Sequence, residues 1–204
     1  MISDVYLERI HKLMATGSRR LLGLVGPPGA GKSTLACQLA QALGDKAIVV
    51  PMDGYHLANA ELKRLQRADR KGAPDTFDSA GYVALLRRLK ANVPGETVYA
   101  PQFDRTIDEP IAAAIAVESD TPLIITEGNY LLLQQGPWAQ VKALLDEVWY
   151  VEVDTTLRQS RLIERHMQFG RAAEAARDWV EHTDEPNARL IKASAERADV
   201  VFRW

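Results

Sequence analysis

A glycine-rich stretch near one end of the chain constrains its fold more than any other feature. Residues 26–34 have the sequence GPPGAGKST, which matches the pattern G-x-x-x-x-G-K-[ST] at every fixed position. An apolar run over residues 21–25 comes before it, and apolar side chains recur at helical spacing over residues 35–43. A strand, a glycine loop and a helix in this order predict a phosphate-binding P-loop.

The predicted loop can hold a nucleotide for physical reasons. Its glycines let several backbone N–H groups point into one concavity, and the following helix directs its positive end into the same space. Lys32 can reach the β- and γ-phosphates of ATP, which makes it a catalytic candidate, and the Ser33 hydroxyl can bind Mg²⁺. The expected nucleotide-binding residues of the loop are Gly26, Pro27, Pro28, Gly29, Ala30, Gly31, Lys32, Ser33 and Thr34.

Composition and charge indicate a single globular domain and give no sign of a membrane-spanning or nucleic-acid-binding protein. The chain has 204 residues, 47% of them hydrophobic, and we expect one domain over residues 1–204 with a lid segment at about residues 156–184. A formal net charge of −2 gives no general attraction to nucleic acid or to an anionic membrane. We find no run of 18 apolar residues that would predict a membrane span. The single cysteine, Cys37, cannot form an internal disulfide, which fits a cytoplasmic location.

Buried strands and amphipathic helices alternate along the chain. The pattern predicts strands at residues 20–25, 47–52, 111–117, 123–128, 147–154 and 199–202. It predicts helices at residues 3–16, 32–43, 80–91, 138–146, 156–168, 172–183 and 186–197, and a loop at residues 102–105. This alternation is typical of an α/β fold with three α/β/α layers. The P-loop places it among the P-loop NTPases, with a mostly parallel sheet and a helical lid.

Two acidic residues lie at the ends of predicted buried strands. Asp53 follows the strand at residues 47–52, and Glu127 lies near the end of the strand at residues 123–128. Ligands of open parallel sheets bind beyond the carboxyl ends of the strands, so both acids are expected beside the P-loop. Asp53 can accept a proton from a substrate hydroxyl or hold Mg²⁺ through water. Glu127 is a candidate metal ligand together with Ser33.

A predicted helix at residues 156–168 carries several arginines. Arg158, Arg161 and Arg165 are three and four residues apart, which places them on roughly one face. Such a face can fold over a polyphosphate and neutralise the charge that spreads over a transferred phosphoryl group. The alternative is a solvated basic face with Glu164 as an internal partner.

Other polar residues near the predicted site are candidates for contacts with the phosphoryl acceptor. Cations there can bind an anionic acceptor, or they can pair with Asp75, Asp78 and Asp104. Asp78 is also a candidate cap for the helix at residues 80–91, and His56 can be a substrate contact or a structural group. The candidate acceptor-binding residues are Asp53, His56, Arg70, Lys71, Asp78 and Arg105.

Several segments taken together resemble those of one enzyme family. Besides the P-loop, they are MDGYH at residues 52–56, RKGAPDTFD at 70–78, PQFDR at 101–105 and IITEGNYLL at 124–132. With them, nearly the whole chain resembles the phosphoribulokinase/uridine kinase family of P-loop kinases, which includes bacterial pantothenate kinase. Within that family it is most similar to a bacterial subgroup called nucleoside/nucleotide kinase-like or fructose-transport-system kinase.

The resemblance implies an ATP-dependent kinase that acts on a hydroxyl of a small metabolite and uses Mg²⁺. It implies that Asp53 is the base, that Glu127 is an acid of the metal and nucleotide site, and that Arg161, Arg165 and Arg171 belong to a closing lid. Members of the family often form dimers, so a homodimer is one expectation. Uridine kinases have an Asp-x-Phe-Tyr pattern after this strand, whereas residues 53–56 have the sequence DGYH, which is nearer to pantothenate kinases.

Other classes of nucleotide-binding protein fit less well. Residues 78–81 match D-x-x-G, but the chain has no N-K-x-D motif for guanine, and it has no L-S-G-G-Q signature of a transporter ATPase. A non-catalytic nucleotide-binding module stays open as an alternative. Among acceptors we favour a sugar or sugar-like polyol, with pantothenate and nucleosides as the next alternatives.

Overall fold

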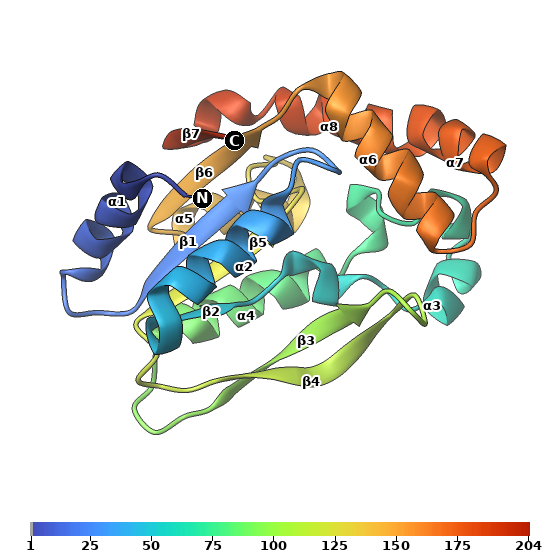
Figure 1. The fold of residues 1–204 in the computed structure, drawn as a ribbon. Coiled ribbons are helices and arrows are strands. Elements are labelled where there is room, and N and C mark those ends of the chain that lie inside the picture. The colour runs from blue at the N-terminus through green and yellow to red at the C-terminus, as the bar shows by residue number, and fades with distance from the viewer. Residues whose placement is uncertain (1) are drawn as a thin grey trace.

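The computed structural model describes residues 2–204, and a five-stranded parallel sheet lies at its centre (Figure 1). Its strands occur in the order β2–β5–β1–β6–β7. Every neighbouring pair is parallel, so all the carboxyl ends of the strands meet at one edge of the sheet. The strands are β1 (Arg20–Val25), β2 (Ala47–Val49), β5 (Leu123–Gly128), β6 (Glu147–Glu152) and β7 (Val200–Arg203).

Helices cover both faces of this sheet (Figure 1). Alternate residues of β1 point to opposite sides, so Leu22 and Leu24 pack with helices α1 (Asp4–Met14) and α2 (Lys32–Leu43). Leu21 and Val25 face the other layer. That layer contains α4 (Ser79–Ala91), α5 (Val141–Leu144) and α8 (Glu185–Lys192). The predicted three-layer α/β/α fold is therefore confirmed. No helix among residues 2–204 is long and apolar enough to cross a membrane.

An antiparallel hairpin stands apart from the central sheet. It consists of β3 (Val98–Asp104) and β4 (Glu109–Val117), which pair only with each other (Figure 1). The predicted loop at residues 102–105 is wrong for its first three residues, because these continue β3. The strand expected at residues 111–117 is confirmed as part of β4.

The segment after β2 is a short 3₁₀ turn at Met52–Tyr55, so the predicted strand at residues 47–52 is too long. Gly54 lies in this turn, and a Cβ atom there would collide with the backbone carbonyl of Pro101 in β3. Only a glycine allows the turn and the hairpin to approach so closely. This contact brings the neighbouring Asp53 next to the hairpin.

The segment between β6 and β7 is helical, and its first helix packs against the P-loop. Helix α6 (Thr155–Gln168) starts at the Asp154 cap, which accepts a hydrogen bond from the Leu157 amide at 2.9 Å. Helix α7 (Ala173–Trp179) then continues through a π-helical turn at Val180–Asp184 into α8. The predicted break between two helices near residue 184 is therefore wrong, because the π turn joins them without interruption. A short helix α3 (Asn59–Arg64) precedes the loop that leads to α4.

Candidate active site

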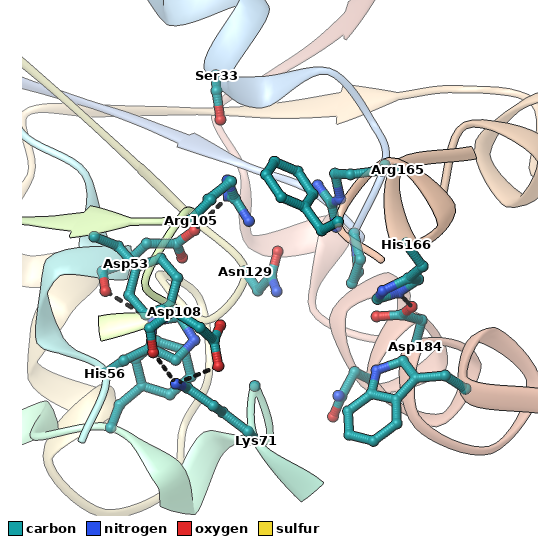
Figure 2. Close-up of a pocket in the computed structure, with 18 of the residues that line it drawn as sticks. Ser33, Asp53, His56, Lys71, Arg105, Asp108, Asn129, Arg165, His166 and Asp184 are labelled. Carbon is teal, nitrogen blue, oxygen red and sulfur yellow. Dashed lines mark hydrogen bonds and ion pairs between the residues drawn. The ribbon is translucent and has the colours of Figure 1, made fainter. Parts of the chain in front are cut away.

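A cavity of about 480 Å³ opens beside the P-loop at the carboxyl edge of the sheet (Figure 2). Residues from distant parts of the sequence line it, with the P-loop and β5 on one side, the hairpin and α3 on another, and α6 to α8 on a third. Its polar and charged lining residues include Lys32, Ser33, Asp53, His56, Asn59, Lys71, Arg105, Asp108, Glu127, Asn129, Arg165, His166, Arg171, Asp184 and Asn187.

Lys32 is held by the loop that it belongs to. Its Nζ donates hydrogen bonds to the Gly26 carbonyl at 2.9 Å, to the Pro27 carbonyl at 3.2 Å and to Asn129 Oδ1 at 2.8 Å. Burial lowers the pKa of the Lys32 ammonium to about 8, although the nearby carboxylates of Glu127 and Asp53 partly oppose this shift. The ammonium thus lies buried within the loop, bound to three oxygen atoms.

Ser33 and Glu127 form the oxygen-rich part of the site. The Ser33 hydroxyl donates a hydrogen bond of 2.8 Å to Glu127 Oε1. Burial raises the pKa of Glu127, and the charge of Asp53 raises it further. Among residues 2–204, no three His, Cys, Asp or Glu side chains gather as a metal site. A hydroxyl and a carboxylate fit Mg²⁺, which usually takes few protein oxygens and completes its shell with water and phosphates.

Asp53 lines the cavity from the turn after β2 and pairs with the hairpin. Arg105 Nη2 is 3.1 Å from Asp53 Oδ2, and the ion pair is drawn in Figure 2. The His56 ring lies between Phe77 and Phe103, with centroid distances of 4.0 and 4.5 Å. Burial lowers the pKa of His56, so its ring is neutral at physiological pH. Its Nδ1 donates to the Asp53 backbone carbonyl at 2.7 Å, which leaves Nε2 as an acceptor.

Lys71 closes the bottom of the cavity. Its Nζ donates to Asp108 Oδ2 at 2.9 Å (Figure 2). It also donates to Asn59 Oδ1 at 2.6 Å. These contacts join the loop before α4 to the tip of the β3–β4 hairpin and to the start of α3. The charge of Lys71 is thus matched by a carboxylate before any substrate binds.

The third wall comes from the segment that contains helices α6, α7 and α8, and it faces the other two walls (Figure 2). Burial lowers the pKa of Arg165, but a guanidinium stays charged at neutral pH. The Arg171 guanidinium lies 3.7 Å from the centroid of the Trp179 ring. His166 Nε2 and Asp184 Oδ2 are 2.9 Å apart. The π turn at Val180–Asp184 places Asp184 in this wall.

Of the nine P-loop residues expected at the nucleotide site, six line this cavity or a neighbouring one. Pro28, Gly29, Lys32 and Ser33 line the cavity. Gly31 and Thr34 line a neighbouring cavity, together with Arg161. The other loop residues, Gly26, Pro27 and Ala30, contribute backbone carbonyls that accept hydrogen bonds from side chains.

Two predicted acceptor contacts do not line either cavity. Arg70 turns away and pairs with Asp75, with Nη2 2.9 Å from Oδ2. Asp78 caps α4 by accepting a hydrogen bond of 2.8 Å from the Gly81 amide. Arg158, one of the three arginines on the predicted helix face, is buried and pairs with Glu185. In each case a local partner explains the position of the side chain.

Sequence reasoning missed several residues that line the cavity. Asn129 carried a signal, because it follows Glu127 at the end of a buried strand. His166 and Asp184 carried none, since a π turn brings them together and the helical spacing of the sequence does not indicate one. Asn59 and Asp108 meet only because the hairpin folds back over α3.

Comparisons with known proteins agree with this geometry. The sequence model of the phosphoribulokinase/uridine kinase family matches residues 21–204. A protein of Schizosaccharomyces pombe named "putative uridine kinase C227.14" is 33% identical over 98% of this chain and 89% of its own length. The uncharacterized protein YggC of Escherichia coli is 32% identical over 98% of this chain and 86% of its own length.

A solved structure shows the same arrangement. The "putative fructose transport system kinase" from Silicibacter sp. TM1040 is 40% identical to this chain. It superposes with a TM-score of 0.83 over 91% of this chain and 90% of its own. The P-loop, the parallel sheet, the matched family model and these relatives lead to one conclusion: the chain belongs to the phosphoribulokinase/uridine kinase family of ATP-dependent kinases.

Proposed function

We propose that this kinase transfers the γ-phosphoryl group of Mg-ATP to a hydroxyl of a small metabolite, and that the acceptor is a sugar or a sugar-like polyol. The observation that carries this proposal is the position of Asp53. Its side chain lines the same cavity as Lys32 and Ser33, but it comes from the turn after β2, a segment separate from the P-loop. An acceptor hydroxyl bound between the two segments would meet a carboxylate on one side and the terminal phosphate on the other.

Asp53 is suited to take the proton of the acceptor hydroxyl. Its Oδ2 is fixed by Arg105 at 3.1 Å, while Glu127 is engaged by Ser33 on the P-loop side. The two acids therefore have separate partners and separate tasks. General base catalysis by a carboxylate fixed in this way contributes a factor of roughly 10²–10⁴ to the rate.

Cations around the P-loop would stabilise the charge of the transferred phosphoryl group. Lys32 lies within the loop, and Arg105 and Arg165 line the cavity from the hairpin and from α6. Mg²⁺ held by Ser33 and Glu127 would act as a Lewis acid and neutralise part of the negative charge on the phosphate oxygens. Closure of α6 and α7 over the cavity would exclude water, which competes with the acceptor.

The charge balance of the acceptor side supports a neutral, hydroxyl-rich acceptor. Asp108 matches the charge of Lys71, and Asp53 matches that of Arg105. Apart from Arg165 and Arg171 in the third wall, the cavity also has neutral polar groups, such as the His56 ring and the amides of Asn129 and Asn187. These groups can form single hydrogen bonds with sugar hydroxyls. The name of the similar Silicibacter protein also points to a sugar.

A nucleoside is the second candidate acceptor. Phe103, Phe169 and Trp179 line the cavity, and aromatic rings of this kind can stack on a base. The name of the similar Schizosaccharomyces pombe protein refers to uridine. Pantothenate is a further alternative, because residues 53–56 have the pattern DGYH that is closer to pantothenate kinases.

The experiment is a measurement of ADP release from Mg-ATP with a panel of acceptors. The panel contains fructose and other hexoses, sugar phosphates, glycerate, pantothenate, uridine and cytidine. We expect one hexose or polyol to raise turnover well above the rate of ATP hydrolysis without an acceptor. Asp53→Asn should lower that stimulated turnover by roughly 10²–10⁴-fold while the affinity for ATP is kept.

A matched variant controls for the loss of an acidic group. Asp69→Asn changes an exposed aspartate that lies outside the cavity, and it should leave turnover unchanged. If uridine or cytidine alone stimulates turnover, the sugar assignment is wrong and the nucleoside assignment replaces it. If no acceptor stimulates turnover although ATP binds tightly, a non-catalytic nucleotide-binding module becomes the better description.

A further inference from the structure

A second cavity of about 480 Å³ lies on the other flank of the P-loop. It shares Gly29, Lys32, Ser33, Arg105 and Arg165 with the first cavity, so the two open on either side of the same phosphate-binding groups. The second cavity alone contains Gly31, Thr34, Arg161 and Trp204. Asp53, Glu127 and Asn129 line only the first.

Trp204, which follows β7, is fixed against the P-loop by one edge. Its indole Nε1 donates a hydrogen bond of 2.9 Å to the Ala30 carbonyl. A Cβ atom at Gly31, whose φ is +87°, would lie 2.9 Å from Cζ2 of the indole. Phe202 meets the ring edge-on at a centroid distance of 5.4 Å. The residue is nevertheless 52% exposed and lines the second cavity, so a part of its indole stays open to that cavity.

The two cavities fix the direction in which a bound triphosphate must lie. This inference rests on the proposed function, in which the phosphoryl group to be transferred faces Asp53 and therefore the first cavity. Lys32 reaches the β- and γ-phosphates, and the backbone at the start of the following helix receives the α-phosphate. Thr34 lies in this helix start and lines only the second cavity. The ribose and the base consequently leave the P-loop on the side of Trp204.

We propose that the open surface of the Trp204 indole is the stacking platform for the purine base of the nucleotide. Stacking on an aromatic ring contributes substantially to the binding of a base and depends on the ring of the base rather than on its edge. Arg161, which is exposed on α6 beside this platform, can contact the base or the α-phosphate from the other side.

The lining of the second cavity also predicts which nucleotides it accepts. Among the described residues that line it, none has an amide or a carboxylate side chain, the groups that best distinguish the edges of adenine and guanine. A stacking surface without such groups recognises the large ring system of a purine and does not distinguish one purine from another. We therefore expect ATP and GTP to bind with affinities within roughly one order of magnitude of each other, because stacking tolerates different bases.

The test compares the binding of ATP, GTP and inorganic tripolyphosphate by calorimetry, without any acceptor. Trp204→Ala should weaken ATP and GTP by roughly tenfold or more and leave tripolyphosphate unchanged, because tripolyphosphate has no base. Trp204→Phe should keep most of the affinity, since it retains a ring but loses the bond to Ala30. Tyr99→Ala removes another exposed aromatic residue that lies outside both cavities and should change nothing.

Tryptophan fluorescence gives a second readout of the same contact. Of the four tryptophans, Trp138 and Trp149 are buried. ATP stacked on Trp204 should quench part of the fluorescence of the wild-type protein, and this part of the quenching should be missing in Trp204→Phe. The proposal is overturned if Trp204→Ala weakens tripolyphosphate as much as ATP, which would mean that Trp204 only shapes the loop through Ala30. It is also overturned if Trp204→Ala binds ATP normally. Neither outcome depends on the acceptor, so the acceptor assignment is tested separately.

Discussion

The P-loop side and the acceptor side of the active site are built in different ways. On the P-loop side, Lys32 is held by carbonyls five and six residues before it in the sequence. On the acceptor side, Asp53 pairs with a residue 52 positions away and Lys71 with a residue 37 positions away. These carbonyls are backbone atoms of one short segment, and the end of β5 adds two side-chain partners, Glu127 for Ser33 and Asn129 for Lys32. The acceptor side is held together by side chains of segments that meet only in the folded protein.

This difference suggests how one scaffold serves different substrates. Backbone atoms cannot be changed by substitution, so the geometry that holds the phosphates is constant once the loop has formed. Ion pairs such as Asp53–Arg105 and Lys71–Asp108 can be replaced one residue at a time. Specificity for the acceptor therefore resides in side chains placed on a constant frame, as is usual where one fold supports many reactions.

The largest effect is expected on the P-loop side, for Lys32→Ala. The change removes the main positive charge at the β- and γ-phosphates, and turnover of ATP should fall by at least about 10³-fold. Turnover is measured as ADP release with the acceptor that the panel identifies, after circular dichroism has shown that the variant is folded. Activity near that of the wild type would contradict the assignment of the loop.

The pH dependence of binding provides a control for the same residue. Because burial lowers the pKa of Lys32 to about 8, the free wild-type protein loses this charge as the pH rises above that value. ATP should therefore bind more weakly above about pH 8, by up to about tenfold for each pH unit, since the bound form requires the proton. Lys32→Ala should show no such fall. A wild-type affinity that stays flat to pH 10 would mean that Lys32 remains charged.

The P-loop side could be predicted almost completely from the sequence. The pattern of residues 26–34 is local, and its flanking strand and helix have the predicted bounds at Arg20–Val25 and Lys32–Leu43. Glu127 was predictable for the same reason, because a buried apolar run ends in it. The alternation of residues 111–117 indicated a strand, but it could not show that β3 and β4 form a sheet of their own.

The acceptor side could be predicted only in part, because its contacts are long-range. His56, Lys71 and Arg105 were identified as candidates from their positions in loops, and they do line the cavity. Their partners could not be identified, since the tip of the hairpin folds over α3 and periodicity contains no information about that. The pairing of His166 with Asp184 depends on a π turn, which disturbs the helical spacing that such predictions use.

An intermediate effect is expected on the acceptor side, for Lys71→Met. The change keeps the length of the side chain but removes the ammonium that joins the loop before α4 to Asp108 and Asn59. Loss of hydrogen bonds to a charged group should raise the KM for the acceptor by roughly 10–100-fold, while the affinity for ATP stays the same. Lys63→Met is the matched control, because Lys63 is exposed on α3 and lies outside both cavities. An equal loss of ATP affinity in Lys71→Met would show that the two sides are not separate.

The smallest effect is expected for Asp78→Ala, because Asp78 lines neither the P-loop side nor the acceptor side of the active site. Asp78 was a candidate acceptor contact, but its Oδ1 accepts the Gly81 amide at 2.8 Å and caps α4. Removal of such a cap should lower the free energy of unfolding by about 1 kcal/mol, measured by urea denaturation, with kcat and KM unchanged. The opposite result, a KM for the acceptor that rises while stability is kept, would return Asp78 to the acceptor site. It would also show that the cavity extends past the first turn of α4 when the acceptor binds.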